Sequence, residues 1–166
     1  MSQEPATPPI TVTITLNGRE ITRTAPAHFT LLRWLRDVAG VYDAKYGCGE
    51  GVCGACTVLV DGEAVSSCSV LVAQVDGSEV RTVSGLLGED GSLNDLQRAF
   101  LERGAAQCGF CTPGMLLAST ELLAEGEPLD RERIRHALHG NLCRCTGYEA
   151  IVSAIDSVAR GVGKAR

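Results

Sequence analysis

The alternation of apolar and polar residues in the first part of the chain predicts β-structure around one helix. From residue 10 to residue 16, isoleucine, valine and leucine alternate with threonine, which is typical of a half-buried strand. Asn17-Gly18 follows and is a strong signal for a two-residue type I′ hairpin turn, so we expect the return strand at residues 21–24. Residues 30–39 then carry leucine and valine at helical spacing, with Thr30 as the expected N-cap.

A second hairpin is expected further along. Residues 57–60 form an apolar run, Asp61-Gly62 is a turn signal, and residues 64–68 provide the returning strand. Weaker strand candidates are residues 70–74 and 79–83. Two hairpins with one packed helix predict an α+β unit over residues 10–84.

After Gly85 the pattern becomes helical. Four segments suit short helices: residues 92–103, 113–125, 130–138 and 147–160. Four short helices with brief connections predict a small bundle over residues 92–160. We therefore expect two domains joined by a linker at residues 85–91, with a disordered Pro-rich arm at residues 1–9 and a frayed tail at residues 161–166.

Composition narrows the class of protein. Of the 166 residues, 45% are hydrophobic but only 4% are aromatic, so small side chains fill much of the core and a bound metal would add stability. The net charge of −5, with scattered basic residues, argues against nucleic-acid binding. The start, MSQEPATPP, lacks the features of a secretory signal, and no apolar run reaches membrane length. We expect a cytoplasmic protein with no nucleic-acid partner and no membrane span.

The eight cysteines fall into two groups of four, with none left over. The first tetrad is Cys48, Cys53, Cys56 and Cys68, and the second is Cys108, Cys111, Cys143 and Cys145. The first begins with C-x4-C-x2-C, which is the plant-type [2Fe–2S] spacing. In a reducing compartment, so many thiols favour metal ligation over disulfides. The sequence predicts two [2Fe–2S] clusters and a role in carrying single electrons between two other redox centres.

The residues around the first tetrad support this interpretation. Four glycines, Gly47, Gly49, Gly51 and Gly54, alternate with its cysteines. We expect them to let the backbone bend around a cluster and direct N–H groups at sulfur. The hairpin at Asp61-Gly62 returns the chain towards its starting point, so Cys68 can complete the tetrad.

The second tetrad contains an internal similarity. In both Cys111-Thr112 and Cys145-Thr146, a cysteine precedes a threonine that can cap the next helix. Pro113 suits the first helical position, and Thr146 with Glu149 has the spacing of a capping box. Both cysteine pairs are therefore expected at helix N-termini, where free N–H groups favour an anionic cluster.

Other chemistry has weaker support. Zinc would fit Cys108-x2-Cys111 alone, but the single residue between Cys143 and Cys145 is unusual for a zinc finger. His28 is expected in a turn, and His136 and His139 are expected to face solvent. The chain has no nucleotide-binding loop and no acid–base or nucleophile constellation, so we expect no substrate chemistry from it alone.

Three segments together carry a family resemblance: GCGEGVCGACTV, QCGFCTPGM and NLCRCTGY. In their order and separation they resemble the small iron–sulfur subunit of the xanthine oxidase (molybdenum hydroxylase) family, in its separate-chain bacterial form. The resemblance covers residues 10–160. It implies an N-terminal β-grasp, ferredoxin-like domain and a C-terminal four-helix bundle.

The resemblance also implies partners. A medium FAD-binding subunit would lie near the first cluster and a large molybdopterin-binding subunit near the second, in a dimer of heterotrimers. Gln107 and Cys145 would contact the molybdopterin. Electrons would then pass from the molybdenum centre through both clusters to FAD. The competing hypotheses are a free two-cluster ferredoxin and a zinc-binding interaction protein.

Overall fold

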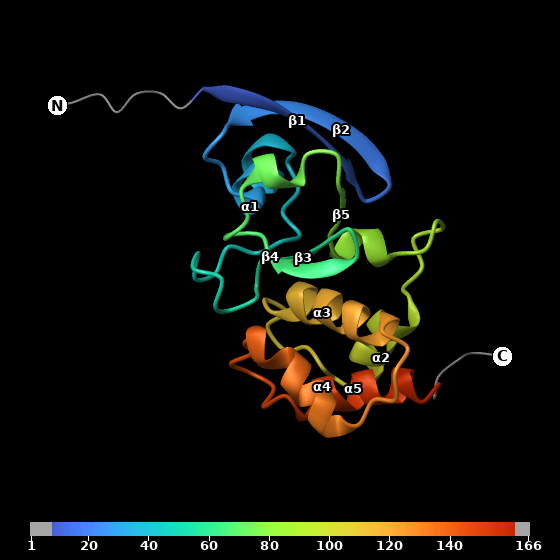
Figure 1. The fold of residues 1–166 in the computed structure, drawn as a ribbon. Helices are drawn as coiled ribbons and strands as arrows, with labels where there is room; N and C mark the ends of the chain where they lie inside the picture. The colour runs from blue at the N-terminus through green and yellow to red at the C-terminus, as the bar shows by residue number, and fades with distance from the viewer. Residues whose placement is uncertain (1–7, 162–166) are drawn as a thin grey trace.

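The computed structural model describes residues 8–161 and has an α+β fold (Figure 1). A five-stranded mixed sheet with a short helix lies at one end, and helices α2 to α5 lie at the other (Figure 1). Most of the predicted arm and tail, residues 1–7 and 162–166, lies outside the described residues. The strand β1 begins at Pro9, inside the segment that was expected as an arm.

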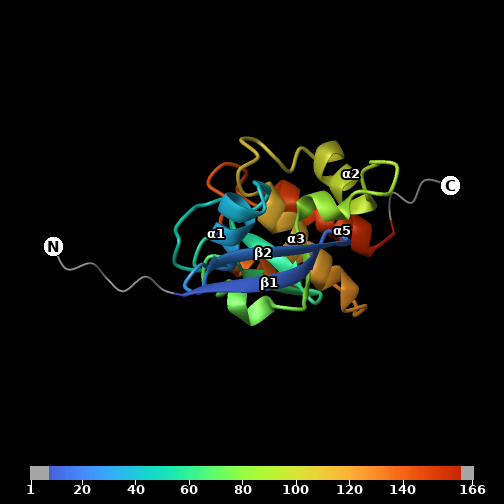
Figure 2. The same cartoon turned by 90° about the horizontal axis from the view of Figure 1, so that it is seen from above.

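The first hairpin forms as the alternation predicts. Strand β1 (Pro9–Leu16) pairs antiparallel with β2 (Arg19–Pro26), and Ile14 lies opposite Ile21. Asn17 and Gly18 have φ values of 50° and 78°, as a type I′ turn requires. The apolar positions of β1 face the core, while threonine hydroxyls pair across the other face. Seen from above, β1 and β2 cross the molecule in front of α3 and α5 (Figure 2).

The second hairpin completes the sheet, whose strand order is β2-β1-β5-β3-β4. Strand β3 (Thr57–Val60) pairs antiparallel with β4 (Glu63–Ser66) through the turn at Asp61-Gly62. Strand β5 (Glu79–Arg81) runs parallel to β1 and antiparallel to β3. Because β4 ends at Ser66, Cys68 lies just beyond the strand that was expected to carry it.

The predicted strand at residues 70–74 is wrong. The chain forms a 3₁₀ turn there, Val72–Val75, which buries the two valines that are three residues apart. The Gln74 side chain accepts a hydrogen bond from the Leu71 amide at 2.9 Å and starts the turn. The backbone just before it, at Val70, bonds to Leu31 N at 2.7 Å, so this segment closes over the first helix. That helix is α1 (Leu31–Arg33), continued by a π-helical turn (Trp34–Val38), and Thr30 caps it as predicted.

All four predicted segments of the second half contain a helix. These are α2 (Asp95–Glu102), α3 (Thr112–Ala124), α4 (Arg131–Ala137), extended by a 3₁₀ turn (Leu138–Gly140), and α5 (Glu149–Ala159). Asn94 and Gln97 form a capping box at α2, and Asp130 caps α4.

The predicted threonine caps are wrong. The N-cap of α3 is Cys111, and Thr112 is already the first helical residue. The N-cap of α5 is Tyr148, which has a φ of 67°. Thr146 does not cap α5, because its hydroxyl is bonded closer by, to Tyr148 N at 3.2 Å and to Cys143 Sγ at 3.1 Å.

Two hydrophobic cores adjoin each other. One lies between the sheet and α1 and includes Trp34, which is fully buried. The other lies among α2 to α5 and also takes in Leu59 from β3, because α3 packs against that strand. Among the described residues, no helix is long and apolar enough to cross a bilayer. The division into two independent domains stays a prediction.

Candidate iron–sulfur sites

The loop between the π-helical turn and β3 carries three cysteines of the first tetrad, and the fourth, Cys68, follows β4. Cys48 is exposed and Cys53 is half-buried, while Cys56 and Cys68 are buried. Backbone N–H groups point at these sulfurs. Glu50 N and Cys53 N both lie 3.4 Å from Cys48 Sγ, and Gly51 N lies 3.2 Å from Cys68 Sγ. The predicted N–H donors to sulfur are thus present.

The glycines allow this loop to close. Gly49, Gly51 and Gly54 have φ values of 76°, 74° and 66°, in the left-handed region that side chains disfavour. Gly47 is required for a different reason, since a Cβ there would lie 2.7 Å from Cys53 Sγ. The backbone therefore bends tightly around the position of the first tetrad.

Cys68 reaches the tetrad through the β3–β4 hairpin. Ser67 Oγ donates to the carbonyl oxygen of Cys56 at 2.6 Å, and this bond fixes the two ends of the hairpin against each other. Burial raises the pKa of the Cys56 thiol to about 11, while the backbone N–H of Cys68 acts to lower it and the thiol of Cys68 acts to raise it. The hairpin thus brings Cys56 and Cys68 together, as the sequence predicts.

The second tetrad is assembled from the α3 N-terminus and the loop before α5. Cys108 Sγ and Cys145 Sγ lie 3.6 Å apart, and the thiols of Cys111 and Cys143 also contact each other. Only Cys111 lies at a helix N-terminus as predicted, because Thr146–Tyr148 separates Cys145 from α5.

Hydrogen bonds distinguish the sulfurs electrostatically. Backbone N–H groups, chiefly that of Glu50, lower the pKa of Cys48 to about 6 and stabilise its thiolate. Burial raises the pKa of Cys111 to about 12. Burial also acts to raise the pKa of Cys143, but hydrogen bonds from Thr146, Cys145 and Cys111 together outweigh it and leave this pKa below its ordinary value. The fold thus provides N–H and O–H donors to an anionic group at both tetrads.

The sulfurs are arranged in pairs, which suits a two-iron core. The close pairs are Cys48 with Cys53, Cys56 with Cys68, Cys108 with Cys145, and Cys111 with Cys143. A [2Fe–2S] core bound by four cysteines takes two thiolates on each iron. The pairing of sulfurs in both tetrads therefore matches the two irons of a [2Fe–2S] core.

Gln107 lies at the exposed end of the second tetrad. It precedes Cys108, whose sulfur is beside that of Cys145, and all three residues are exposed. The structure therefore brings together the two residues that the resemblance implies for pterin contact.

The structure also reveals residues that the sequence analysis missed. Leu142 N donates to the carbonyl oxygen of Cys53 at 2.9 Å, so the ligand loops of the two tetrads are directly bonded. Asn141, the residue before it, is buried and contacts Gly54 in the first loop. The only available signal was its position two residues before Cys143.

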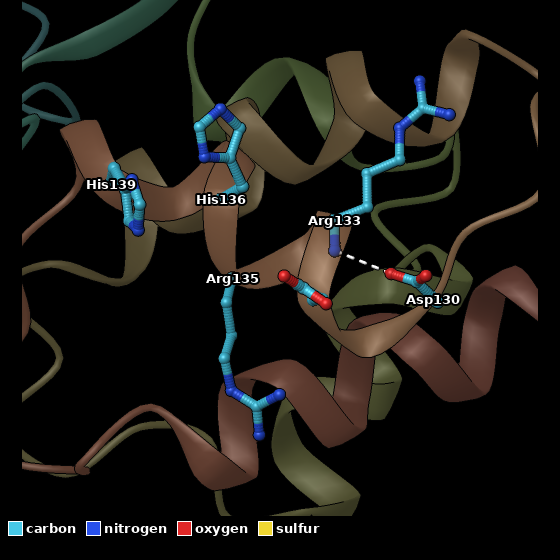
Figure 3. Close-up of a pocket in the computed structure, with 6 residues that line it drawn as sticks. Asp130, Arg133, Arg135, His136 and His139 are labelled. Carbon is cyan, nitrogen blue, oxygen red and sulfur yellow. Dashed lines mark hydrogen bonds between the residues drawn. The ribbon is translucent and has the colours of Figure 1, made fainter.

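A charged hollow of about 580 Å³ lies over α4, and none of the residues that line it is a cysteine (Figure 3). Its lining residues are Asp130, Glu132, Arg133, Arg135, His136 and His139. The rings of His136 and His139 lie edge to face with centroids 5.0 Å apart, and both residues are exposed, as predicted. Asp130 accepts a hydrogen bond from Arg133 N at 2.7 Å, which caps the helix (Figure 3). These contacts are those of a solvated helix face.

Comparisons with known proteins agree with this geometry. Residues 14–85 match the family described as "2Fe-2S iron-sulfur cluster binding domain", and residues 82–156 match "[2Fe-2S] binding domain". The chain is 48% identical over 146 residues to the nicotine 6-hydroxylase small subunit of Paenarthrobacter nicotinovorans, covering 88% of this chain and 87% of that protein. It is 46% identical to the xanthine dehydrogenase iron-sulfur-binding subunit of Escherichia coli O157:H7, covering 88% and 92%.

This chain belongs to the small iron–sulfur subunits of the xanthine oxidase (molybdenum hydroxylase) family.

Solved structures show the same fold in this family. Quinoline 2-oxidoreductase from Pseudomonas putida 86 matches with a TM-score of 0.86 and 42% identity, covering 93% of this chain and 96% of that chain. Aldehyde oxidoreductase from Desulfovibrio gigas matches with a TM-score of 0.86 and 37% identity, but the match covers only 17% of its longer chain. As a small iron–sulfur subunit with two [2Fe–2S]-binding domains, this chain carries two clusters and transfers electrons within an oxidoreductase.

Proposed function

We propose that this subunit passes electrons from a molybdopterin centre in a large partner subunit, through its two clusters, to FAD in a medium partner subunit. The cluster ligands are Cys48, Cys53, Cys56 and Cys68 at the first site and Cys108, Cys111, Cys143 and Cys145 at the second. The observation that carries the proposal is the pairing of sulfurs in both tetrads, joined by the bond between Leu142 and Cys53. Each [2Fe–2S] cluster, when bound, accepts and releases one electron at a time.

The protein groups around each site stabilise added negative charge. At the first site, N–H groups of the glycine-rich loop point at Cys48 and Cys68. At the second site, the Thr146 hydroxyl and amide lie 3.1 Å and 3.4 Å from Cys143 Sγ. Such donors to ligand sulfur favour the reduced state, and they set the potential together with burial.

The exposed ends of the two sites support the direction of transfer. At the second site Cys108 and Cys145 reach the surface beside Gln107, which we assign as the end that contacts the molybdopterin. At the first site Cys48 is exposed, and the nearby Tyr46 is 65% exposed, which suits a surface covered by the FAD subunit. We do not expect a free two-cluster ferredoxin to expose such large side chains beside its clusters, because no partner subunit would cover them.

The architecture follows the same proposal. We assign a β-grasp, ferredoxin-like domain to residues 10–84 and a four-helix bundle to residues 92–160, with residues 85–91 between them. The full assembly is proposed to be a dimer of heterotrimers.

The test begins with the purified subunit. Metal and sulfide analysis should give about four iron and about four acid-labile sulfide per chain, as two [2Fe–2S] clusters require. Reduction should give two distinct electron paramagnetic resonance (EPR) signals, because one site lies in a glycine-rich loop and the other beside helix ends. An iron content near half that value, or zinc at stoichiometric level, would contradict the proposal. Co-purification with two larger subunits that carry molybdopterin and FAD would distinguish it from a free ferredoxin.

A further inference from the structure

Three backbone segments meet between the two iron–sulfur sites. They are the first ligand loop at Gly54, the start of α3 at Gly114, and the segment Gly140–Asn141 that leads into Cys143. A Cβ at Gly54 would overlap the carbonyl oxygen of Gly140, and a Cβ at Gly114 would overlap the carbonyl oxygen of Gly54. We call this meeting point the junction. Its close backbone packing fixes the approach of the two ligand loops.

Asn141 is the polar side chain that joins the segments of the junction. It is only 6% exposed, and its Nδ2 donates to the carbonyl oxygen of Gly54 and to Thr57 Oγ1, both at 3.1 Å. Its own carbonyl oxygen accepts a hydrogen bond from the Tyr148 hydroxyl at 3.0 Å. The same hydroxyl accepts from Cys143 N at 2.9 Å. Asn141 is therefore tied to the first ligand loop by its side chain and to the second by its backbone.

The position of Asn141 in the chain makes these bonds relevant to electron transfer. Leu142, the next residue, donates to the carbonyl oxygen of Cys53, and the residue after that is the ligand Cys143. If the Asn141 amide released Gly54, the neighbouring Cys53 carbonyl would be free to move away from Leu142. Within residues 8–161, a single side chain thus supports the one backbone–backbone hydrogen bond between the two ligand loops.

We propose that Asn141 is a positioning residue that fixes the separation of the two clusters and holds the Leu142–Cys53 hydrogen bond between them. This inference rests on the proposed two-cluster function. The side chain of Asn141 does not contact a ligand of either cluster, so Asn141 acts only through the junction. Removing its amide leaves Gly54 O with hydrogen bonds from Thr57 N and Thr57 Oγ1, at 3.1 Å and 2.8 Å, so no buried acceptor is orphaned at Gly54. A truncated variant is therefore expected to fold and to bind both clusters.

The experiment compares wild type, Asn141→Ala and a matched control, Asn94→Ala, as the full chain with both clusters. Asn94 also accepts and donates hydrogen bonds, but it caps α2, away from the junction. Hydrogen exchange read by mass spectrometry measures the opening of the peptide containing Leu142. Losing a hydrogen bond of ordinary strength should raise local opening about ten-fold in Asn141→Ala, and Asn94→Ala should leave this peptide unchanged.

The second readout is the magnetic interaction between the two dithionite-reduced clusters, observed as splitting of their EPR signals at low temperature. In Asn141→Ala the individual g-values and the iron content should match wild type, while the splitting weakens or broadens. A residue that only stabilises the fold would lower the unfolding temperature when replaced, as we expect for Asn94→Ala, and leave the splitting unchanged. If Asn141→Ala loses its clusters, Thr57→Val takes its place. It removes one of the two bonds made by Asn141 Nδ2, together with the bond from Thr57 Oγ1 to Gly54 O, and it retains the bond between Asn141 Nδ2 and Gly54 O. It should give the same changes in exchange and splitting, at smaller size.

The outcomes separate the two proposals. A wild-type chain without two reduced cluster signals would overturn both the two-cluster function and this inference. Normal wild-type signals, with exchange and splitting unaltered in Asn141→Ala or in its substitute Thr57→Val, would overturn the positioning role alone.

Discussion

Gly114→Ala tests whether the close approach of α3 to the first ligand loop constrains the fold. Gly114 is buried, it is the third residue of α3, and its φ is that of an ordinary helical residue. On helix propensity alone, alanine should stabilise this position by up to about 1 kcal/mol. At the junction, however, the new Cβ would overlap Gly54 O and lie 3.3 Å from the carbonyl carbon of Gly54. These are backbone atoms, which cannot rotate away as a flexible side chain can.

The steric cost of the added methyl group should exceed the stability gained from the higher helix propensity of alanine. Overpacking a close-packed site costs about 1–3 kcal/mol, and this site has backbone on the opposing side, so the upper half of that range applies. Subtracting the gain in helix propensity leaves a net destabilisation of about 1–2 kcal/mol. For a chain of this length, that corresponds to a fall of about 2–8 °C in the unfolding temperature.

The assay is thermal unfolding of the cluster-loaded chain, followed by far-ultraviolet circular dichroism at one fixed scan rate. Gly140→Ala is the matched control, because its added Cβ meets nothing within 4 Å and its φ is not positive. We expect this control to unfold at the wild-type temperature or slightly above it. The reasoning is refuted if Gly114→Ala is as stable as wild type, or if both variants lose the same stability.

Three further substitutions test the assignment of the sites. Cys68→Ser should abolish only the first cluster, because the ligands of the second cluster come from other segments of the chain. Loss of both EPR signals would contradict the predicted two-domain division. Thr146→Val removes the hydroxyl that lies 3.1 Å from Cys143 Sγ, so the reduction potential of the second cluster should fall. Thr146→Ser retains the hydroxyl and should retain the potential. An EPR-monitored redox titration that finds the same potential in Thr146→Val would show that the hydroxyl plays no part. Gln107→Ala should leave both cluster spectra normal and slow reduction of the second cluster by substrate about ten-fold in the intact complex. An unaltered rate in rapid-mixing experiments would make Gln107 a structural residue only.

Much of the fold could be predicted because its signals are local. Threonine alternation specifies β1, and Asn17-Gly18 specifies a turn whose positive φ values few other residue pairs accept. The helices of the second half follow from apolar spacing and, at α4, from Asp130 as a cap. Cysteine spacing predicted the grouping into two tetrads, because C-x4-C-x2-C at the first site and C-x2-C with C-x-C at the second place thiols close together along the chain.

The errors arose where another contact outweighs the expected preference. Residues 70–74 have the composition of a strand, but packing against α1, which is distant along the chain, favours a turn that buries Val72 and Val75. Thr146 has capping-box spacing with Glu149, but its hydroxyl is bonded to Cys143 and Tyr148 instead, both within three residues of it. The sequence pattern does not show which of several possible partners a segment or side chain takes.

By itself, the sequence predicted most of the strands and helices and grouped the cysteines into two tetrads. The elements follow from short-range spacing, which a chain retains whatever its tertiary fold. Only the tertiary structure decided that the sulfurs lie in pairs and that Asn141 bonds to Gly54, 87 positions away. It also decided that Gly54 and Gly114 must lack side chains, because each is limited by the backbone of a segment far along the chain. Contacts of this kind exist only once both cores have packed, so no local pattern could predict them.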